Sequence, residues 1–216
     1  MQVEKFLELV KQMRSKSEKR KFEQSVEMTL MIRGIDTKKP EGRISGEAML
    51  PHQPGRPAKV ALFADGELAR VGRDSGVDTV LSRDDIGRLG DEKRELRKLA
   101  EEHDFILAQA DMMVAIGKSL GKVLGPRDKM PRPIPPTANL KPLVERMRKT
   151  VRFRARDQQA ISVRIGTEGM SDEQLAENAR SVFEAVKQKV EEKKGEIKKV
   201  TLKTTMGKPV KMGVEE

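Results

Sequence analysis

Hydroxyl, glycine and lysine residues gather near the end of the chain, where Thr204-Thr205-Met206-Gly207 follows a stretch of alternating apolar and polar residues. The alternation predicts a strand that ends in a turn at these four residues. Five lysines and no acidic residue lie between Lys198 and Lys211, so this strand end attracts an anion. Threonine hydroxyls and a residue without a Cβ suit the sugar-phosphate chain of a nucleic acid. The alternative is a surface strand with a solvated row of lysines and an ordinary glycine turn.

The composition also favours a polyanionic partner, because the 216 residues carry a net charge of +10. The sequence has no run of about 18 apolar residues and no signal-peptide pattern at Met1, so we expect a cytoplasmic protein without membrane contact. There is no cysteine, which excludes disulfides and thiolate metal sites. The two histidines, His52 and His103, are far apart in the sequence, and we expect no metal ion.

The best candidate for nucleotide chemistry is Gly117-Lys118-Ser119, but Met112 stands where a P-loop requires its first glycine. No nucleophile, base and orienting group can be assembled from the sequence with any specificity. We therefore expect no catalytic residue, no cofactor and no enzymatic activity. The alternative is a nucleotide-dependent enzyme that acts on nucleic acid through the middle of the chain, and a basic adaptor for other proteins is a third possibility.

A second basic segment, 125–136, contains five prolines that hold it extended. Its three cations, Arg127, Lys129 and Arg132, predict a secondary contact with RNA or with a neighbouring protein. The alternative is a rigid surface connection. The chain has six phenylalanines and neither tryptophan nor tyrosine, so base stacking cannot be the main means of recognition. We expect recognition of folded RNA through its shape, phosphates and 2′-hydroxyls.

Two different periodicities divide the chain. Both ends have amphipathic helices and half-buried alternating strands: we expect helices at 3–13 and from Ser171 to about Val190, and strands at 22–33, 44–50, 151–153, 161–165 and 200–203. Ser171 and Gln174 form a capping-box pattern at the start of the second helix. The middle has short apolar runs at 60–64, 77–81 and 105–108 that alternate with helical patterns at 67–73, 91–103 and 140–149, as in βαβ units.

Three prolines and a glycine between Pro51 and Pro57 mark the boundary between these patterns. The fold class is therefore predicted as α+β, with a split β-α-β type domain formed by both termini and an inserted α/β Rossmann-like domain. We assign residues 1–52 and 150–216 to the first domain and residues 53–149 to the second.

Five short motifs, taken together and in this order, resemble the large-subunit ribosomal protein one family in its archaeal form. They are Lys21-Phe22-Glu23-Gln24-Ser25-Val26-Glu27, Leu50-Pro51-His52, Leu124-Gly125-Pro126-Arg127, Lys129-Met130-Pro131 and Thr204-Thr205-Met206-Gly207. The resemblance runs over nearly the whole chain. It implies a two-domain structural protein of the large subunit that is monomeric when free and binds the ribosomal RNA of the mobile stalk. It also implies contact with exit-site tRNA and repression of the protein's own mRNA.

The family's RNA-binding residues carry over to Lys21, Phe22, Ser25 and Glu27 on the first strand, and to Thr205, Met206 and Gly207, beside Thr204, in the turn. Hydroxyls would meet ribose 2′-hydroxyls, Glu27 would accept a hydrogen bond or pair with Lys21, and Phe22 and Met206 would cover sugar edges. Two positions depart from the family pattern: Ser162 replaces a histidine of bacterial relatives, and Asp128 stands where glycine is common.

Overall fold

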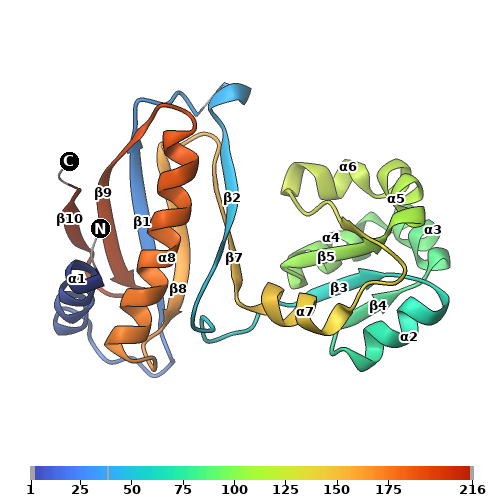
Figure 1. Ribbon diagram of the computed structural model, residues 1–216, viewed down its shortest axis with the longest axis horizontal. Helices are drawn as coiled ribbons and strands as arrows, with labels where there is room; N and C mark the ends of the chain where they lie inside the picture. Colours follow the sequence, from blue (N-terminus) through green and yellow to red (C-terminus); the bar gives the residue numbers. More distant parts are fainter. Residues whose placement is uncertain (1–2, 38, 215–216) are drawn as a thin grey trace. The chain divides into compact units, whose positions relative to one another are not determined.

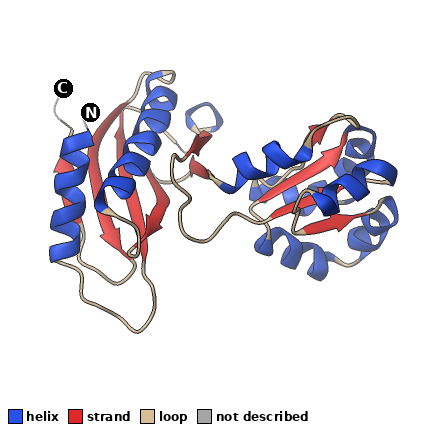
Figure 2. Cartoon of the chain, turned by 60° about the horizontal axis from the view of Figure 1, so that its bottom comes forward, coloured by secondary structure: helices blue, strands red, loops and turns tan. Residues whose placement is uncertain are grey.

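The structure is a computed structural model that describes residues 3–37 and 39–214. It has two compact units (Figures 1 and 2): unit 1 combines the chain up to Pro57 with the chain from Lys149 onward, and unit 2 comprises residues 58–148. Helices and several β-sheets occur together, which confirms the α+β class.

Unit 1 contains an antiparallel four-stranded sheet in the order β10-β9-β1-β8, and a separate antiparallel pair, β2 and β7. Its strands are β1 Ser25–Arg33, β2 Ile44–Met49, β7 Thr150–Ala155, β8 Ala160–Thr167, β9 Glu196–Thr204 and β10 Val210–Gly213. Its helices are α1 Val3–Ser15, the short 3-10 helix η1 Pro40–Gly42, and α8 Asp172–Glu191. Strand β1 begins three residues later than the alternation suggested.

Helices α1 and α8 lie against one face of the four-stranded sheet (Figure 1), and that face carries the buried residues of each strand. On β1 these are Val26, Met28, Leu30 and Ile32, which alternate with half-buried or exposed residues. The rings of Phe6 on α1 and Phe183 on α8 pack with their centroids 5.7 Å apart. Burial of this apolar face is the main force that joins the two ends of the chain.

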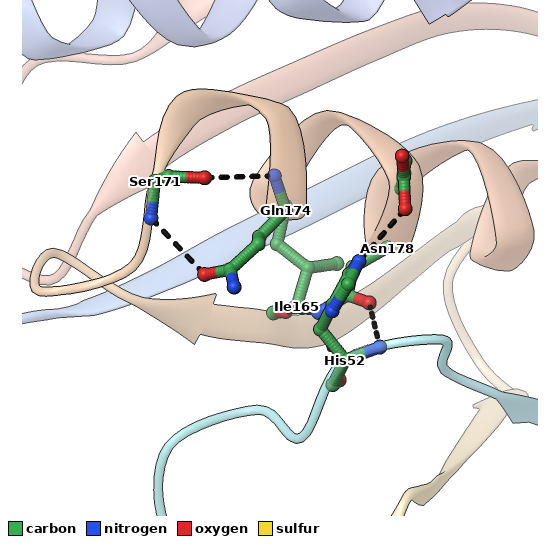
Figure 3. Close-up of polar contacts among 6 residues, drawn as sticks. His52, Ile165, Ser171, Gln174 and Asn178 are labelled. Atoms are coloured by element: carbon green, nitrogen blue, oxygen red, sulfur yellow. Dashed lines mark hydrogen bonds and ion pairs between the residues drawn. The ribbon is translucent and has the colours of Figure 1, made fainter.

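The start of α8 follows the predicted capping box. The amide of Gln174 donates to Ser171 Oγ over 3.3 Å, and the amide of Ser171 donates to Gln174 Oε1 over 3.2 Å (Figure 3). One turn later, Asn178 is fully buried and holds the linker that leads to unit 2. Its Oδ1 accepts from the amide of His52 at 3.0 Å, and its Nδ2 donates to His52 O at 3.0 Å and to Ile165 O at 2.8 Å.

Residues beyond His52 also belong to unit 1. Arg164 donates from Nη2 to Arg56 O over 3.0 Å, and a Cβ on Gly55, whose φ is +74°, would collide with Thr167. These contacts with β8 explain why unit 1 extends to Pro57, five residues past the boundary that the prolines suggested.

Unit 2 is built on a parallel sheet in the order β4-β3-β5-β6. Its strands are β3 Val60–Phe63, β4 Thr79–Leu81, β5 Phe105–Gln109 and β6 Arg132–Ile134. Its helices are α2 Gly66–Asp74, α3 Arg83–Asp91, α4 Lys93–Glu102, α5 Met113–Ser119, α6 Gly121–Leu124 and α7 Leu140–Arg148, with 3-10 turns η2 Ala110–Met112 and η3 Gly125–Arg127. Two apolar clusters, each containing helix residues, include side chains of β3 and β5.

The helix expected over 91–103 is confirmed as α4, whereas the separate helix α3 before it was not predicted. Ser82 and Asp85 form a complete capping box that starts α3. The segment 125–136 is not a simple extended connection, because it contains η3 and then β6, which pairs in parallel with β5.

Candidate nucleic-acid interface

The turn after β9 is bonded directly to the start of β1. The amide of Thr205 donates to Ser25 O over 3.0 Å. The hydroxyl of Thr205 accepts from the amide of Ser25 at 3.1 Å and approaches Ser25 O at 3.3 Å. The two segments, 180 residues apart in the sequence, therefore form one surface, as the sequence predicted. However, the Thr205 hydroxyl already serves the backbone of β1, which leaves it one lone pair as an acceptor.

Thr204 and Gly207 shape the turn from inside. Thr204 is only 2% exposed, and its hydroxyl bonds to Ser17 Oγ at 2.9 Å. Its side chain is therefore not available to a ligand, contrary to our expectation. A Cβ on Gly207 would lie 2.2 Å from Thr204 Oγ1, so any larger residue would collide with the turn itself. Close packing within the protein accounts for this glycine without a ligand.

The exposed part of the turn is apolar and basic. Met206 is 62% exposed and Phe22 is 51% exposed, which is unusual for large apolar side chains. Lys21 is exposed, and it forms no ion pair with another residue of the described chain. The Ser25 hydroxyl likewise has no hydrogen-bond partner among residues 3–37 and 39–214. We call Lys21, Phe22, Ser25, Thr205 and Met206 the turn site.

Glu27 lies beside the turn site on the sheet face opposite the two helices. It is the cross-strand neighbour of Lys203 and Arg164, and its Oε2 is 3.3 Å from Lys203 Nζ. The pairing alternative proposed for Glu27 thus has the wrong partner, because the register of β1 and β9 brings Lys203, and not Lys21, opposite the carboxylate. Both members of the pair are more than a third exposed, so the ion pair adds little stability.

The same sheet face continues in a row of hydroxyls. Thr29 on β1 lies between Ser162 on β8 and Thr201 on β9, and the hydroxyls of Thr29 and Ser162 are 2.9 Å apart. Lys211 is the cross-strand neighbour of Thr201 on the outer strand. Ser162, which had no assigned role, therefore belongs to a basic and hydroxyl-bearing surface next to the turn site.

The cations predicted to make a secondary contact are engaged within unit 2. Arg127 is 3.5 Å from Glu101 Oε1, and the Arg132 guanidinium lies 5.7 Å from the ring centre of Phe105. Lys129 Nζ donates to Ala100 O at 2.5 Å and to His103 O at 2.8 Å, which are carbonyls at the end of α4. All three cations therefore have contacts within unit 2, and their role in a secondary contact stays a prediction.

Asp128 has a left-handed backbone conformation with φ of +55°. Glycine adopts this conformation without steric cost, and aspartate is one of the few other residues that tolerate it. The departure from the family pattern at this position therefore leaves the turn after η3 intact.

Sequence reasoning assigned no role to Gln24, which is central to the site. Its side chain is 1% exposed and its Oε1 accepts from the amide of Met206 at 3.0 Å. The only sequence signal is that Gln24 is polar at a position where the alternation with Glu23 and Ser25 calls for an apolar residue. That signal is too weak to use without coordinates.

The fold and the site together define a class: a basic α+β protein with a parallel α/β unit inserted into an antiparallel one. In the part of the chain that the structure describes, no group of three or more His, Asp or Glu residues could hold a metal ion. Nor is any described helix long and apolar enough to cross a membrane.

Comparison with known proteins identifies the family. Residues 14–208 match the model of the Ribosomal protein L1p/L10e family. The chain is 44% identical over 216 residues to large ribosomal subunit protein uL1 of Methanocaldococcus jannaschii, an alignment covering 100% of this chain and 98% of the relative. It is 41% identical over 209 residues to uL1 of Methanothermobacter thermautotrophicus (97% and 99% covered). It is 45% identical over 202 residues to uL1 of Thermofilum pendens (93% and 89% covered).

This chain therefore belongs to the ribosomal protein L1 family. The resemblance inferred from the five motifs is confirmed, including its archaeal character, because these relatives come from archaea. Proteins of this family are structural components of the ribosome, so the chain is not an enzyme. The alternative of a nucleotide-dependent enzyme is not favoured.

Proposed function

We propose that unit 1 binds ribosomal RNA of the mobile stalk of the large ribosomal subunit, and that the turn site makes the central contact. The observation that carries this proposal is the joining of Thr205 to Ser25, which brings an exposed methionine, an exposed phenylalanine and an exposed lysine onto one small surface. Apolar groups that cover sugar edges exclude water and strengthen nearby hydrogen bonds. The membership in a family of large-subunit proteins supplies the partner class.

The remaining hydrogen-bonding capacity fits ribose. The Ser25 hydroxyl can donate to and accept from a 2′-hydroxyl, and the Thr205 hydroxyl retains one lone pair. Lys203, Lys211 and Arg164 supply positive charge on the neighbouring sheet face, where phosphates would lie. Recognition would then depend on the shape and the 2′-hydroxyls of a folded RNA rather than on stacked bases.

A direct test compares an RNA fragment of the stalk region with a DNA copy of the same sequence at matched salt concentration. We expect the DNA to bind far more weakly. Equal affinity would leave only general electrostatic attraction and would contradict a role for 2′-hydroxyls.

A matched pair of lysine variants locates the interface. Lys21 and Lys11 are both exposed lysines of unit 1. Lys11 is on α1, which covers the face of the sheet opposite to the face that carries Glu27. Lys21→Ala should weaken RNA binding several-fold and reduce its salt dependence, whereas Lys11→Ala should leave both unchanged. Equal effects of the two substitutions would place the RNA elsewhere.

We further propose that the protein helps to release tRNA from the exit site, and that it represses its own mRNA by binding an RNA fold similar to the ribosomal one, acting as a monomer when free. The resemblance to the family supports these roles. If one surface serves both RNAs, the mRNA leader should compete with the ribosomal fragment, and Met206→Ala should weaken binding of both by the same factor. Simultaneous binding of the two RNAs would contradict the shared surface.

A further inference from the structure

Gln24 lies beneath the turn site with its whole side-chain amide engaged. Its Oε1 accepts from the amide of Met206 at 3.0 Å, and its Nε2 donates to Glu18 O at 3.0 Å and to Glu168 Oε2 at 3.2 Å. Its backbone carbonyl accepts from the amide of Glu168 at 2.9 Å. At 1% exposure, the residue cannot itself touch a ligand. A buried amide with both ends bonded joins the segments around it into one arrangement.

The backbone amides of Thr205, Met206 and Gly207 have three different partners. That of Thr205 donates to Ser25 O on β1, that of Gly207 donates to Thr204 O within the turn, and that of Met206 donates to the side chain of Gln24. Met206 is also more exposed than Phe22, the other large apolar side chain of the turn site. The position of its backbone, and hence the direction of its side chain, therefore depends on a residue outside the turn.

Glu168 and the carbonyl of Glu18 together determine which way the Gln24 amide points. A carboxylate can only accept, and so can the carbonyl of Glu18, so both require the NH₂ group of Gln24. The oxygen of the amide then necessarily faces Met206. Glu168 is itself held by Arg14, whose Nη1 donates to Glu168 O over 2.9 Å. A continuous set of contacts thus runs from α1 through the turn after β8 to Met206.

We propose that Gln24, oriented by Glu168, is the positioning residue of the turn site and that RNA affinity depends on it although it makes no contact with RNA. This inference rests on the proposed function. It adds a buried glutamine and a surface carboxylate to the residues that determine affinity, and it predicts that a negative charge, Glu168, supports the binding of a polyanion.

The test exchanges the hydrogen-bonding roles of the pair. In Gln24→Glu, the carboxylate has no proton to donate to Glu18 O and lies about 3 Å from the Glu168 carboxylate, so repulsion should move it away from the amide of Met206. We expect at least a tenfold loss of affinity for the stalk RNA fragment. Adding Glu168→Gln removes the repulsion and restores a donor between the two side chains, while Glu18 O stays without its donor, so affinity should recover in part. A role in general stability alone would not predict this recovery at equal thermal stability.

Amide hydrogen exchange of Met206, followed by NMR without RNA, provides an independent measurement. The amide should be protected in the original protein, exposed in Gln24→Glu and protected again in the double variant. If Gln24→Glu does not fold, Glu168→Ala offers a milder change that should raise the exchange rate of Met206 and weaken RNA binding about threefold.

The proposal would be overturned if Gln24→Glu kept the RNA affinity of the original protein or, where Gln24→Glu does not fold, if Glu168→Ala kept it. It would also be overturned if the double variant stayed folded but recovered no affinity. Absence of RNA binding by the original protein would contradict the proposed function instead, and the Met206 exchange rates would then still show whether Gln24 positions the turn.

Discussion

The turn 204–207 in unit 1 and the segment 125–136 in unit 2 both contain glycine and have several cations within or near them. In unit 2 the cations are bonded to a carboxylate, to helix-end carbonyls and to an aromatic ring. In unit 1 the polar groups inside the turn bond to one another, and an exposed methionine, phenylalanine and lysine face outward. Similar residue types therefore stabilise the fold in one region and remain available to a partner in the other.

The contrast shows that whether a side chain is available to a partner depends on the hydrogen bonds that the surrounding residues make. The turn can present Met206 because Gln24, Thr204 and the backbone of Ser25 satisfy its polar groups from within. Lys129 cannot present its ammonium group, because removing it would leave two carbonyls of α4 without their donor. Substitutions in the two regions should therefore separate cleanly into effects on RNA affinity and effects on stability.

The largest effect should come from Gly207→Ala. The added Cβ would lie 2.2 Å from Thr204 Oγ1, which is buried and bonded to Ser17, so the turn must distort. We expect RNA affinity, measured by filter binding or calorimetry, to fall about 100-fold, or about 2.7 kcal/mol. Thr204→Ala in the same chain removes the colliding oxygen and should recover most of the loss. Unchanged affinity in Gly207→Ala would show that the turn does not contribute to binding.

Met206→Ala should come next, with a loss of about tenfold in RNA affinity, or about 1.4 kcal/mol, and no change in the unfolding midpoint. The reason is that Met206 is 62% exposed and contributes little to the core. Met49→Ala is the control, since Met49 on β2 is 55% exposed and outside the turn site. Equal affinities of the two variants would remove Met206 from the interface.

Lys129→Ala should lower stability and leave RNA binding intact, the reverse of the result expected for Met206→Ala. Loss of the donor to Ala100 O and His103 O should destabilise unit 2 by about 1–2 kcal/mol in chemical denaturation, while RNA affinity stays unchanged. Lys118, an exposed lysine on α5, provides the control, and Lys118→Ala should affect neither quantity. A drop in RNA affinity for Lys129→Ala at full stability would restore a contact role for the basic segment of unit 2.

The smallest effect concerns the capping box of α3. The backbone amide of Ser82 donates to the carboxylate of Asp85 and lowers the pKa of Asp85 below its ordinary value of 3.8. A lowered pKa in the folded state stabilises the protein above pH 3.8, and this contribution disappears as the pH falls through the folded-state pKa. Asp85→Asn should therefore cost about 1 kcal/mol at pH 7 and progressively less below pH 4. A cost independent of pH would exclude the charge as its cause.

Local patterns in the sequence predicted much of the fold. Alternation predicted β1, β8 and β9, and Ser171 with Gln174 predicted the start of α8, because periodicity and capping act over a few residues. The capping box at Ser82 and Asp85 carried the same kind of signal for α3, and we overlooked it. Strand β6 could not be predicted, because two prolines surround it and only its pairing with β5 makes it a strand.

The sequence by itself determined the residue types of the site, its positive charge and the likeness to a ribosomal protein family. Only the tertiary structure decided which of those residues face outward. The burial of Thr204, the pairing of Glu27 with Lys203, the engagement of Lys129 and the position of Gln24 all depend on contacts between segments distant in the chain. Such contacts follow from strand register and core packing, which no local pattern of residues encodes.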